Sequence, residues 1–237
     1  MTNRHVTHLF YARLAGIMLL LYIVVGVASM FVAGQAMGGE QNVALLTKMA
    51  EHEPLARLEA VSGVIAFFIA VILSVALYVL TRDQDPNLAL IAAGCRFGEA
   101  MINAISAIQT LELVSIAKAN RLATPAEVSM VFDVFFKEHG SGVLVSSVCF
   151  AAGSSIYSYL FLRAGNIPVI IAWVGMVASS LLGVYLLVQM MGFVKGNWYI
   201  WMPMLVFEVT LAWWLIFRGV SDTIINKGTT IPIDKIK

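Results

Sequence analysis

Six runs of apolar residues, each long enough to cross a lipid bilayer, constrain this sequence more than any other feature. A helix rises about 1.5 Å per residue, so about 20 apolar residues cross the roughly 30 Å of hydrocarbon in a membrane. In hydrocarbon every backbone N–H and C=O group must be bonded within the protein, and a helix does this inside one segment. The runs therefore predict an all-α membrane protein, a six-transmembrane-helix bundle. The predicted spans are about residues 14–33, 60–80, 88–113, 143–162, 168–190 and 199–217.

The composition agrees with lipid as the main solvent. Of the 237 residues, 60% are apolar and 12% charged, and the mean hydropathy is +0.87, whereas soluble domains are about 25% charged. The net charge is +1 without a basic block, which argues against a nucleic-acid partner. No CxxC, HExxH, Walker or dinucleotide-glycine motif occurs, so we expect neither metal nor cofactor. We treat residues 1–237 as a single integral membrane domain whose partner is the lipid bilayer.

Three spans end with an aromatic residue four positions before an arginine. This spacing places a ring in the headgroup layer and a cation just beyond it. If the three spans share a direction, that side carries eight Lys and Arg residues outside the spans, and the other side carries six. The bias predicts a multi-pass protein of the inner (plasma) membrane with both termini in the cytoplasm. The pairs are Tyr78 with Arg82, Tyr159 with Arg163, and Trp214 with Arg218.

The two longer outer loops predict two short amphipathic helices. Thr124 to Glu127 form a capping box with proline at the first helical position, and Gly140 offers a place for that helix to end. Between them, apolar residues recur on one face at helical spacing. The first loop has a comparable pattern from Val43 to Ala50. Such helices lie on the membrane surface, where they seal the bundle or cover a cavity.

Ionisable side chains within the spans are the main functional signal. Arg96, Glu99 and Asn103 fall within one stripe of the third span, about 80° wide, and Glu208 lies near the midplane in the sixth. An ionisable group at this depth costs about 2.5–3.5 kcal/mol, so it faces the bundle interior and marks a partner or a site. Glu99 and Glu208 are candidate acid/base or proton-relay residues, and Arg96 and Asn103 are candidate binding residues. With one arginine for two carboxylates, we expect at least one carboxyl group to hold a proton at neutral pH.

Other interpretations of these residues stay open. Arg96 also fits a side chain that snorkels to the headgroups, or one that pairs with Glu99 for purely structural reasons. Glu208 also fits a neutral acid bonded to a neighbouring helix. Two boundary residues complete the candidate binding set: Arg57 at the start of the second span and His139 before the fourth. Arg57 equally fits a headgroup anchor, and His139 a helix cap or dipole partner.

Short motifs also occur in a recognisable order along nearly the whole chain. They are Arg13-Leu14-Ala15-Gly16-Ile17, Arg57-Leu58, Arg96-Phe97-Gly98-Glu99-Ala100, His139-Gly140, Leu162-Arg163-Ala164-Gly165 with Pro168, and Pro203 with Glu208 and Trp214. Together they resemble a bacterial family of six-span integral membrane proteins known as domain of unknown function 4386. The resemblance implies this architecture and these candidate residues, and it implies no reaction. The segment around His139 departs most from the family pattern, because Lys137 and Glu138 precede it.

Three functions are compatible with these features. The first is binding or chemical processing of a small lipophilic molecule in an intramembrane cavity near Glu99 and Glu208, which leaves open whether the protein is an enzyme. The second is a structural or regulatory membrane subunit without chemistry. The third is a small proton-coupled transporter that uses the same carboxylates as a relay. Gly175, Ser179 and Gly183 fit close helix packing either within one chain or in a homo-oligomer.

Overall fold

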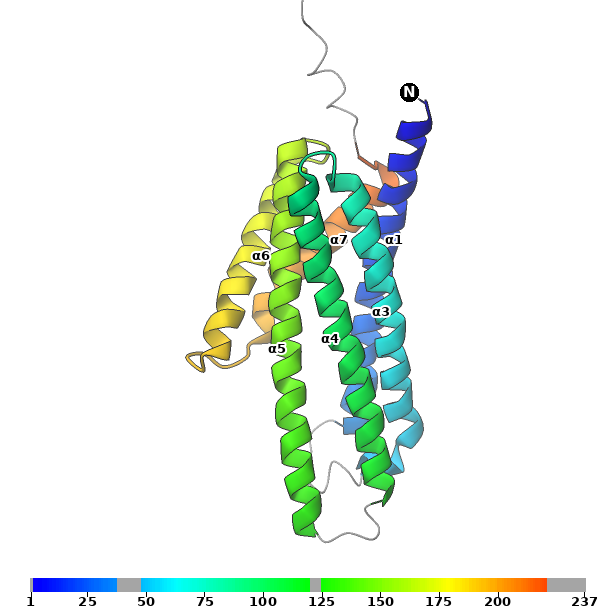
Figure 1. Ribbon diagram of the computed structural model, residues 1–237, viewed down its shortest axis with the longest axis vertical. Coiled ribbons are helices and arrows are strands. Elements are labelled where there is room, and N and C mark those ends of the chain that lie inside the picture. The colour runs from blue at the N-terminus through cyan, green and yellow to red at the C-terminus, as the bar shows by residue number, and fades with distance from the viewer. Residues whose placement is uncertain (1, 38–47, 120–124, 221–237) are drawn as a thin grey trace, which may run out of the picture.

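The chain folds into long helices joined by short connections (Figure 1). The computed structural model describes the backbone of residues 2–37, 48–119 and 125–220, and the side chains of residues 6–35, 48–118 and 142–220. Within the described backbone there is no strand. The elements are α1 (Thr2–Met37), α3 (Glu53–Thr81), α4 (Pro86–Ala119), α5 (Pro125–Ala164), α6 (Val169–Met190), the 3-10 helix η2 (Trp198–Trp201) and α7 (Met202–Phe217).

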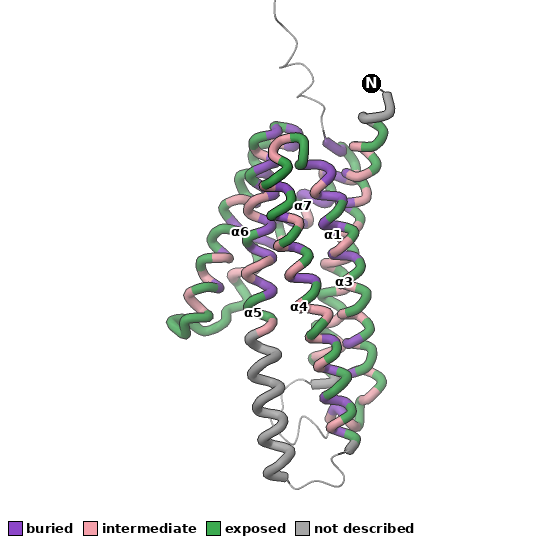
Figure 2. The backbone as a smooth tube through the Cα atoms, viewed as in Figure 1, coloured by how far each residue is buried: buried purple, intermediate pink, exposed green. Residues whose placement is uncertain are grey.

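Within the described residues, six segments are long and apolar enough to cross a membrane: five lie in single long helices, and the sixth consists of η2 and α7 together. These segments are Val6–Gln35, Glu53–Thr81, Pro86–Lys118, Gly142–Ala164, Val169–Met190 and Trp198–Phe217. Large apolar side chains remain exposed on them, among them Phe31, Ile170 and Leu181, and Figure 2 shows exposed positions along every long helix. Such extensive apolar exposure requires lipid rather than water around the bundle. The prediction of an all-α, multi-pass membrane protein with six spans is confirmed.

Helices that follow one another in the chain pack as antiparallel neighbours, and α7 closes the ring against α1. Short connections favour this order. The Asp85 carboxylate caps α4 by accepting the backbone N–H groups of Asn87 and Leu88. After α5, Gly165 adopts a φ of 62°, a left-handed conformation that glycine reaches without strain, and Pro168 then precedes α6.

The three aromatic–arginine pairs lie at one end of the bundle, which we call the arginine end. It holds the N-terminal end of α1 and the C-terminal ends of α3, α5 and α7 (Figure 1). There the Arg218 guanidinium lies over the Trp214 ring, 6.0 Å from its centroid. Arg163 and Asp85 also approach each other there, with 3.9 Å between Nη1 and Oδ2. The three spans therefore share a direction, as their sequences predicted.

Small residues of α6 are used for packing within the chain. A Cβ atom at Gly175 would collide with the Phe207 ring of α7 and the Ser158 hydroxyl of α5. One turn along, the Ser155 hydroxyl donates to the Ser179 hydroxyl across the α5–α6 interface at 2.9 Å. Gly175 and Ser179 thus allow α5, α6 and α7 to approach closely.

The outer helix predicted to end at Gly140 is not a separate element. Its segment is helical and begins at Pro125, as expected, but α5 runs without a break for 40 residues to Ala164. A glycine inside a helix costs only about 1 kcal/mol relative to alanine, less than a broken hydrogen-bond ladder. The cap at Thr124 and the apolar face of this segment lie outside the described residues. In the first loop, residues 48–51 form a helical turn, and the remainder of the predicted helix lies outside the described part of the chain.

The unequal lengths of the helices leave part of the bundle uncovered. At about 1.5 Å per residue, the 36 residues of α1 extend about 54 Å and the 16 residues of α7 about 24 Å. Pro203 lies in the first turn of α7. Proline fits there because the first backbone N–H groups of a helix make no hydrogen bond within it. As Figure 1 shows, α6 and α7 stop part-way along the bundle, while α1, α3, α4 and α5 continue.

Candidate functional site

Arg96 and Glu99 form a buried ion pair on α4. Arg96 Nη1 lies 2.9 Å from Glu99 Oε2, and the two residues are 2% and 4% exposed. Tyr22 of α1 donates its hydroxyl hydrogen to Glu99 Oε1 at 2.7 Å, and the Asn103 amide donates to the Tyr22 oxygen at 3.3 Å. Three of the predicted site residues therefore meet in one network, which also ties α1 to α4.

The Arg96 side chain is held by aromatic rings rather than by the headgroups. Its guanidinium carbon lies 4.7 Å from the centroid of the Phe150 ring and 5.6 Å from that of Tyr22. Burial this deep excludes the snorkelling alternative. The contact with Glu99 is electrostatic, because none of the three guanidinium nitrogens makes a hydrogen bond to a described residue. Cation–π contacts supply part of the stabilisation that a buried guanidinium needs.

Glu208 of α7 is the second buried carboxylate, and its surroundings differ. It is 9% exposed, yet no described residue forms a hydrogen bond or an ion pair with it. A buried carboxylate without a partner is costly, so Glu208 contributes little to stability in this form. A buried, unpaired carboxylate of this kind is typical of a position that binds a ligand or a proton.

A cavity of about 440 Å³ lies between α1, α4, α5, η2 and α7, and both carboxylates line it. We call it the large cavity. It lies where α7 begins, with Trp201 and Met202 on its edge. Its volume falls within the roughly 300–1,000 Å³ of small-molecule sites, and most of its wall is apolar, as is usual for them. The polar residues that line it are Tyr22, Glu99, Asn103, Ser146, Ser147 and Glu208.

A second, small cavity of about 20 Å³ lies toward the arginine end. Arg96, Tyr157 and Ser158 line it together with Glu208, and the Ser158 hydroxyl is buried without a hydrogen-bond partner among the described residues. A polar space needs about 10–15 Å³ to accommodate one water molecule. Glu208 lines both cavities and so separates the ligand-sized space from this water-sized one.

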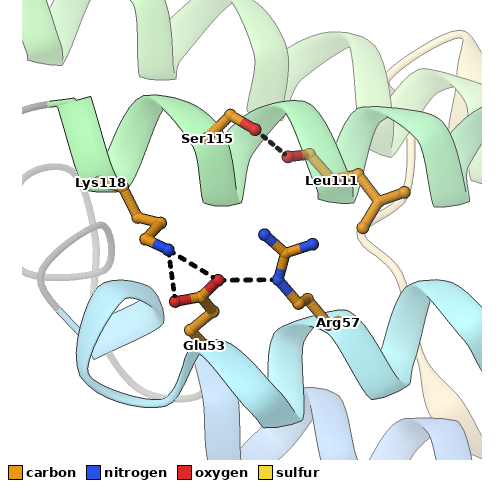
Figure 3. Close-up of polar contacts among 5 residues, drawn as sticks. All are labelled: Glu53, Arg57, Leu111, Ser115 and Lys118. Atoms are coloured by element: carbon orange, nitrogen blue, oxygen red, sulfur yellow. Dashed lines mark hydrogen bonds and ion pairs between the residues drawn. The ribbon is translucent and has the colours of Figure 1, made fainter.

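Arg57 lies apart from these cavities. Its Nε donates to Glu53 at 2.8 Å, and Lys118 of α4 bonds the same carboxylate at 2.9–3.0 Å. Figure 3 shows Glu53 between the two cations, with all three exposed enough for these pairs to be worth little. This cluster links the ends of α3 and α4 opposite the arginine end. The backbone of His139 belongs to α5, and its side chain lies outside the described residues.

Several residues of the large cavity were not predicted as site residues. Tyr22, Phe150, Trp198 and Trp201 line it, as do Ser146 and Ser147 of α5. The adjacent serines Ser146 and Ser147 were not a distinctive signal, because Ser154-Ser155 and Ser179-Ser180 form similar pairs within the spans. Tyr22 sits in mid-span, where a phenol requires a bonding partner. Among the described residues, no three metal-binding side chains come together.

Comparison with known proteins matches the chain to a family model described as "Domain of unknown function (DUF4386)" over residues 14–219. The matched range covers every residue named above for the two cavities. No curated protein and no solved structure matches the chain.

Proposed function

We propose that the protein binds a small lipophilic molecule in the large cavity. The chain belongs to the family described as domain of unknown function DUF4386. That family description specifies no reaction, so the proposal rests on the site itself. The single observation that carries this proposal is a ligand-sized cavity lined by two buried carboxylates, one of them without a hydrogen-bond or ion-pair partner among the described residues. Its apolar walls accept an apolar body, and its few polar groups orient a polar end.

The two carboxylates have different roles in this proposal. Glu99 is held by Arg96 and Tyr22, so it is a fixed acceptor for the ligand. Glu208 is free to exchange a proton or to bond the ligand directly. Where chemistry follows binding, different surroundings let two carboxylates divide acid and base roles. Because Arg96 is the only buried cation among the described residues, charge balance favours one proton shared between Glu99 and Glu208.

Two observations favour the alternative functions. The position of Glu208 between the large and small cavities suits a proton relay in a small proton-coupled transporter. The contacts of Glu99 with Arg96 and Tyr22, by contrast, suit a structural subunit, because they lock α1 to α4. A purely structural bundle gives no reason for a buried Glu208 without a partner among the described residues. Ligand binding explains both Glu99 and Glu208, and a structural role explains Glu99 alone.

Filling the large cavity tests the proposal. A Cβ atom at Gly26, which lines this cavity, meets no described atom within 4 Å, so the side chain of Gly26→Leu starts in open space and fills part of the cavity. Gly94 of α4 has equally open surroundings and does not line the cavity, so Gly94→Leu is the matched control. Both variants gain the same helix propensity.

The measurement is native mass spectrometry of gently purified protein. We expect a bound lipophile on the wild type and on Gly94→Leu, and its loss from Gly26→Leu. A wild type without any bound molecule, or a bound molecule that survives Gly26→Leu, contradicts binding in the large cavity.

We further propose that the arginine end faces the cytoplasm, in the inner membrane. The support is the excess of Lys and Arg at that end, eight against six. With Cys95 and Cys149 replaced by serine, Lys195→Cys between α6 and η2 should react with a membrane-impermeant thiol reagent on intact cells. Gln84→Cys between α3 and α4 should react only after permeabilisation. The opposite labelling pattern reverses the orientation.

A further inference from the structure

We propose that the large cavity selects a lipophilic ammonium ion, that is, a protonated amine on an apolar chain. Glu208 pairs the nitrogen and the aromatic wall encloses it. The inference rests on the proposed function, because it names the class of molecule that the same cavity takes.

The charges around the cavity favour a cation. Glu99 and Glu208 both line it, whereas no Lys, Arg or His does so among the described residues. Arg96 lies behind Glu99 and faces the small cavity instead. Because its charge offsets one carboxylate at most, charge balance favours one proton on the two carboxylates, and loss of that proton leaves an excess negative charge. An occupant with one positive charge takes the place of this proton, whereas an anionic occupant adds repulsion that is strong at low dielectric constant.

Glu208 specifies a donor on the ligand. Its oxygens have no N–H or O–H partner among the described residues, although the side chain is 91% buried. A buried acceptor without a donor is unfavourable, and more so when it is charged. An ammonium nitrogen supplies both the donor and the countercharge, and an alcohol supplies only the donor.

The wall of the cavity suits an ammonium group with an apolar chain. Phe150 and Trp201 pack against each other with 6.0 Å between ring centroids, and both line the cavity. The Phe150 ring already lies against the Arg96 guanidinium, 4.7 Å from the guanidinium carbon to the ring centroid, so this ring system accepts a cation. Ile23, Val27 and Met30 of α1 provide the apolar surface for the chain.

A matched series of octyl compounds tests the inference. Protein in phosphatidylcholine nanodiscs is dialysed against octylammonium, 1-octanol or octanoate, and binding to empty nanodiscs is subtracted. We expect saturable binding of octylammonium at least about tenfold tighter than that of 1-octanol, and no saturable binding of octanoate. Glu208→Gln should lose the preference for octylammonium and still bind 1-octanol. Glu112→Gln, which removes an exposed carboxylate of α4 outside the cavity, should behave as the wild type.

The outcomes separate the two proposals. Equal or weaker binding of octylammonium relative to 1-octanol in the wild type overturns the ammonium assignment and leaves lipophile binding in place. A preference that survives Glu208→Gln overturns it as well. Saturable binding of none of the three compounds overturns the assignment together with the proposed function. The wild-type comparison decides the assignment even where the Glu208→Gln variant does not fold.

Discussion

Gly16 and Gly26 lie ten residues apart on α1 and occupy opposite kinds of surroundings. A Cβ atom at Gly16 would lie 2.7 Å from the Ala212 carbonyl oxygen and 2.7 Å from Ile216 Cγ1, both of α7. A Cβ atom at Gly26 would meet nothing within 4 Å. One helix thus contributes to a packed interface near the arginine end and to the wall of the large cavity further along.

The start of α7 explains the difference. From Met202 onward, α7 runs toward the arginine end and covers α1 around Gly16. Before Met202 the chain forms η2 and a connection from α6, so that part of α1 has no facing helix of this kind. The large cavity is therefore a consequence of a short last helix in a ring of longer ones.

The two carboxylates repeat this contrast. Glu99 has a cation and a phenol hydroxyl as partners, and Glu208 is paired with neither kind of group among the described residues. We expect the stability of the bundle to depend on the first site and ligand binding on the second.

Arg96→Ala has the largest expected effect, a loss of about 3–5 kcal/mol, because it leaves Glu99 as a buried charge without a countercharge. The free energy of unfolding by dodecyl sulfate titration in mixed micelles measures it. Combining Arg96→Ala with Glu99→Gln should recover part of the loss. A double variant no more stable than Arg96→Ala would mean that the pair is not coupled.

Tyr22→Phe should cost about 1.5–3 kcal/mol, the range for a hydrogen bond to a charged acceptor, because it removes the donor to Glu99. The same unfolding titration applies. Tyr185→Phe removes an exposed hydroxyl that donates to the Lys195 carbonyl and is the matched control. Equal losses in the free energy of unfolding for the two variants would show that the buried hydrogen bond stabilises the protein no more than the exposed one.

Gly16→Ala should cost about 1–3 kcal/mol, because the added methyl group overpacks the α1–α7 interface. Gly26→Ala should cost nothing and can gain up to about 1 kcal/mol through helix propensity. Thermal unfolding of both variants in nanodiscs compares the packing of the two parts of α1 directly. Similar shifts in Tm for both would show that the two halves of α1 are packed alike.

Glu208→Gln has the smallest expected effect on stability, less than about 1 kcal/mol, because no protein partner is lost. Unfolding by dodecyl sulfate titration in mixed micelles, under the conditions used for Arg96→Ala, measures this change in the free energy of unfolding. A loss as large as that of Arg96→Ala would assign Glu208 a structural role and remove the main support for a ligand at this position.

Hydropathy along the chain was enough to predict the six spans, and helical spacing placed Arg96 and Glu99 on one face of the third span while leaving open whether they pair. These features depend on residues close in sequence: the backbone of each apolar run bonds within its own helix, and positions i and i+3 share a face. Local signals failed at Gly140, where the continuing hydrogen-bond ladder of α5 outweighs the cost of a glycine.

The tertiary structure alone decided which distant residues meet. Tyr22 reaches Glu99, and Glu208 reaches the same cavity, because of how α1 and α7 are rotated and staggered against α4. Close contacts at Gly16 and Gly175 fix how α7 packs against α1 and α6. Arg57, also a candidate binding residue from the sequence, lies instead in a cluster with Glu53 and Lys118. Periodicity gives the face of a helix within one segment, but its depth and rotation relative to other helices follow from side-chain packing across segments.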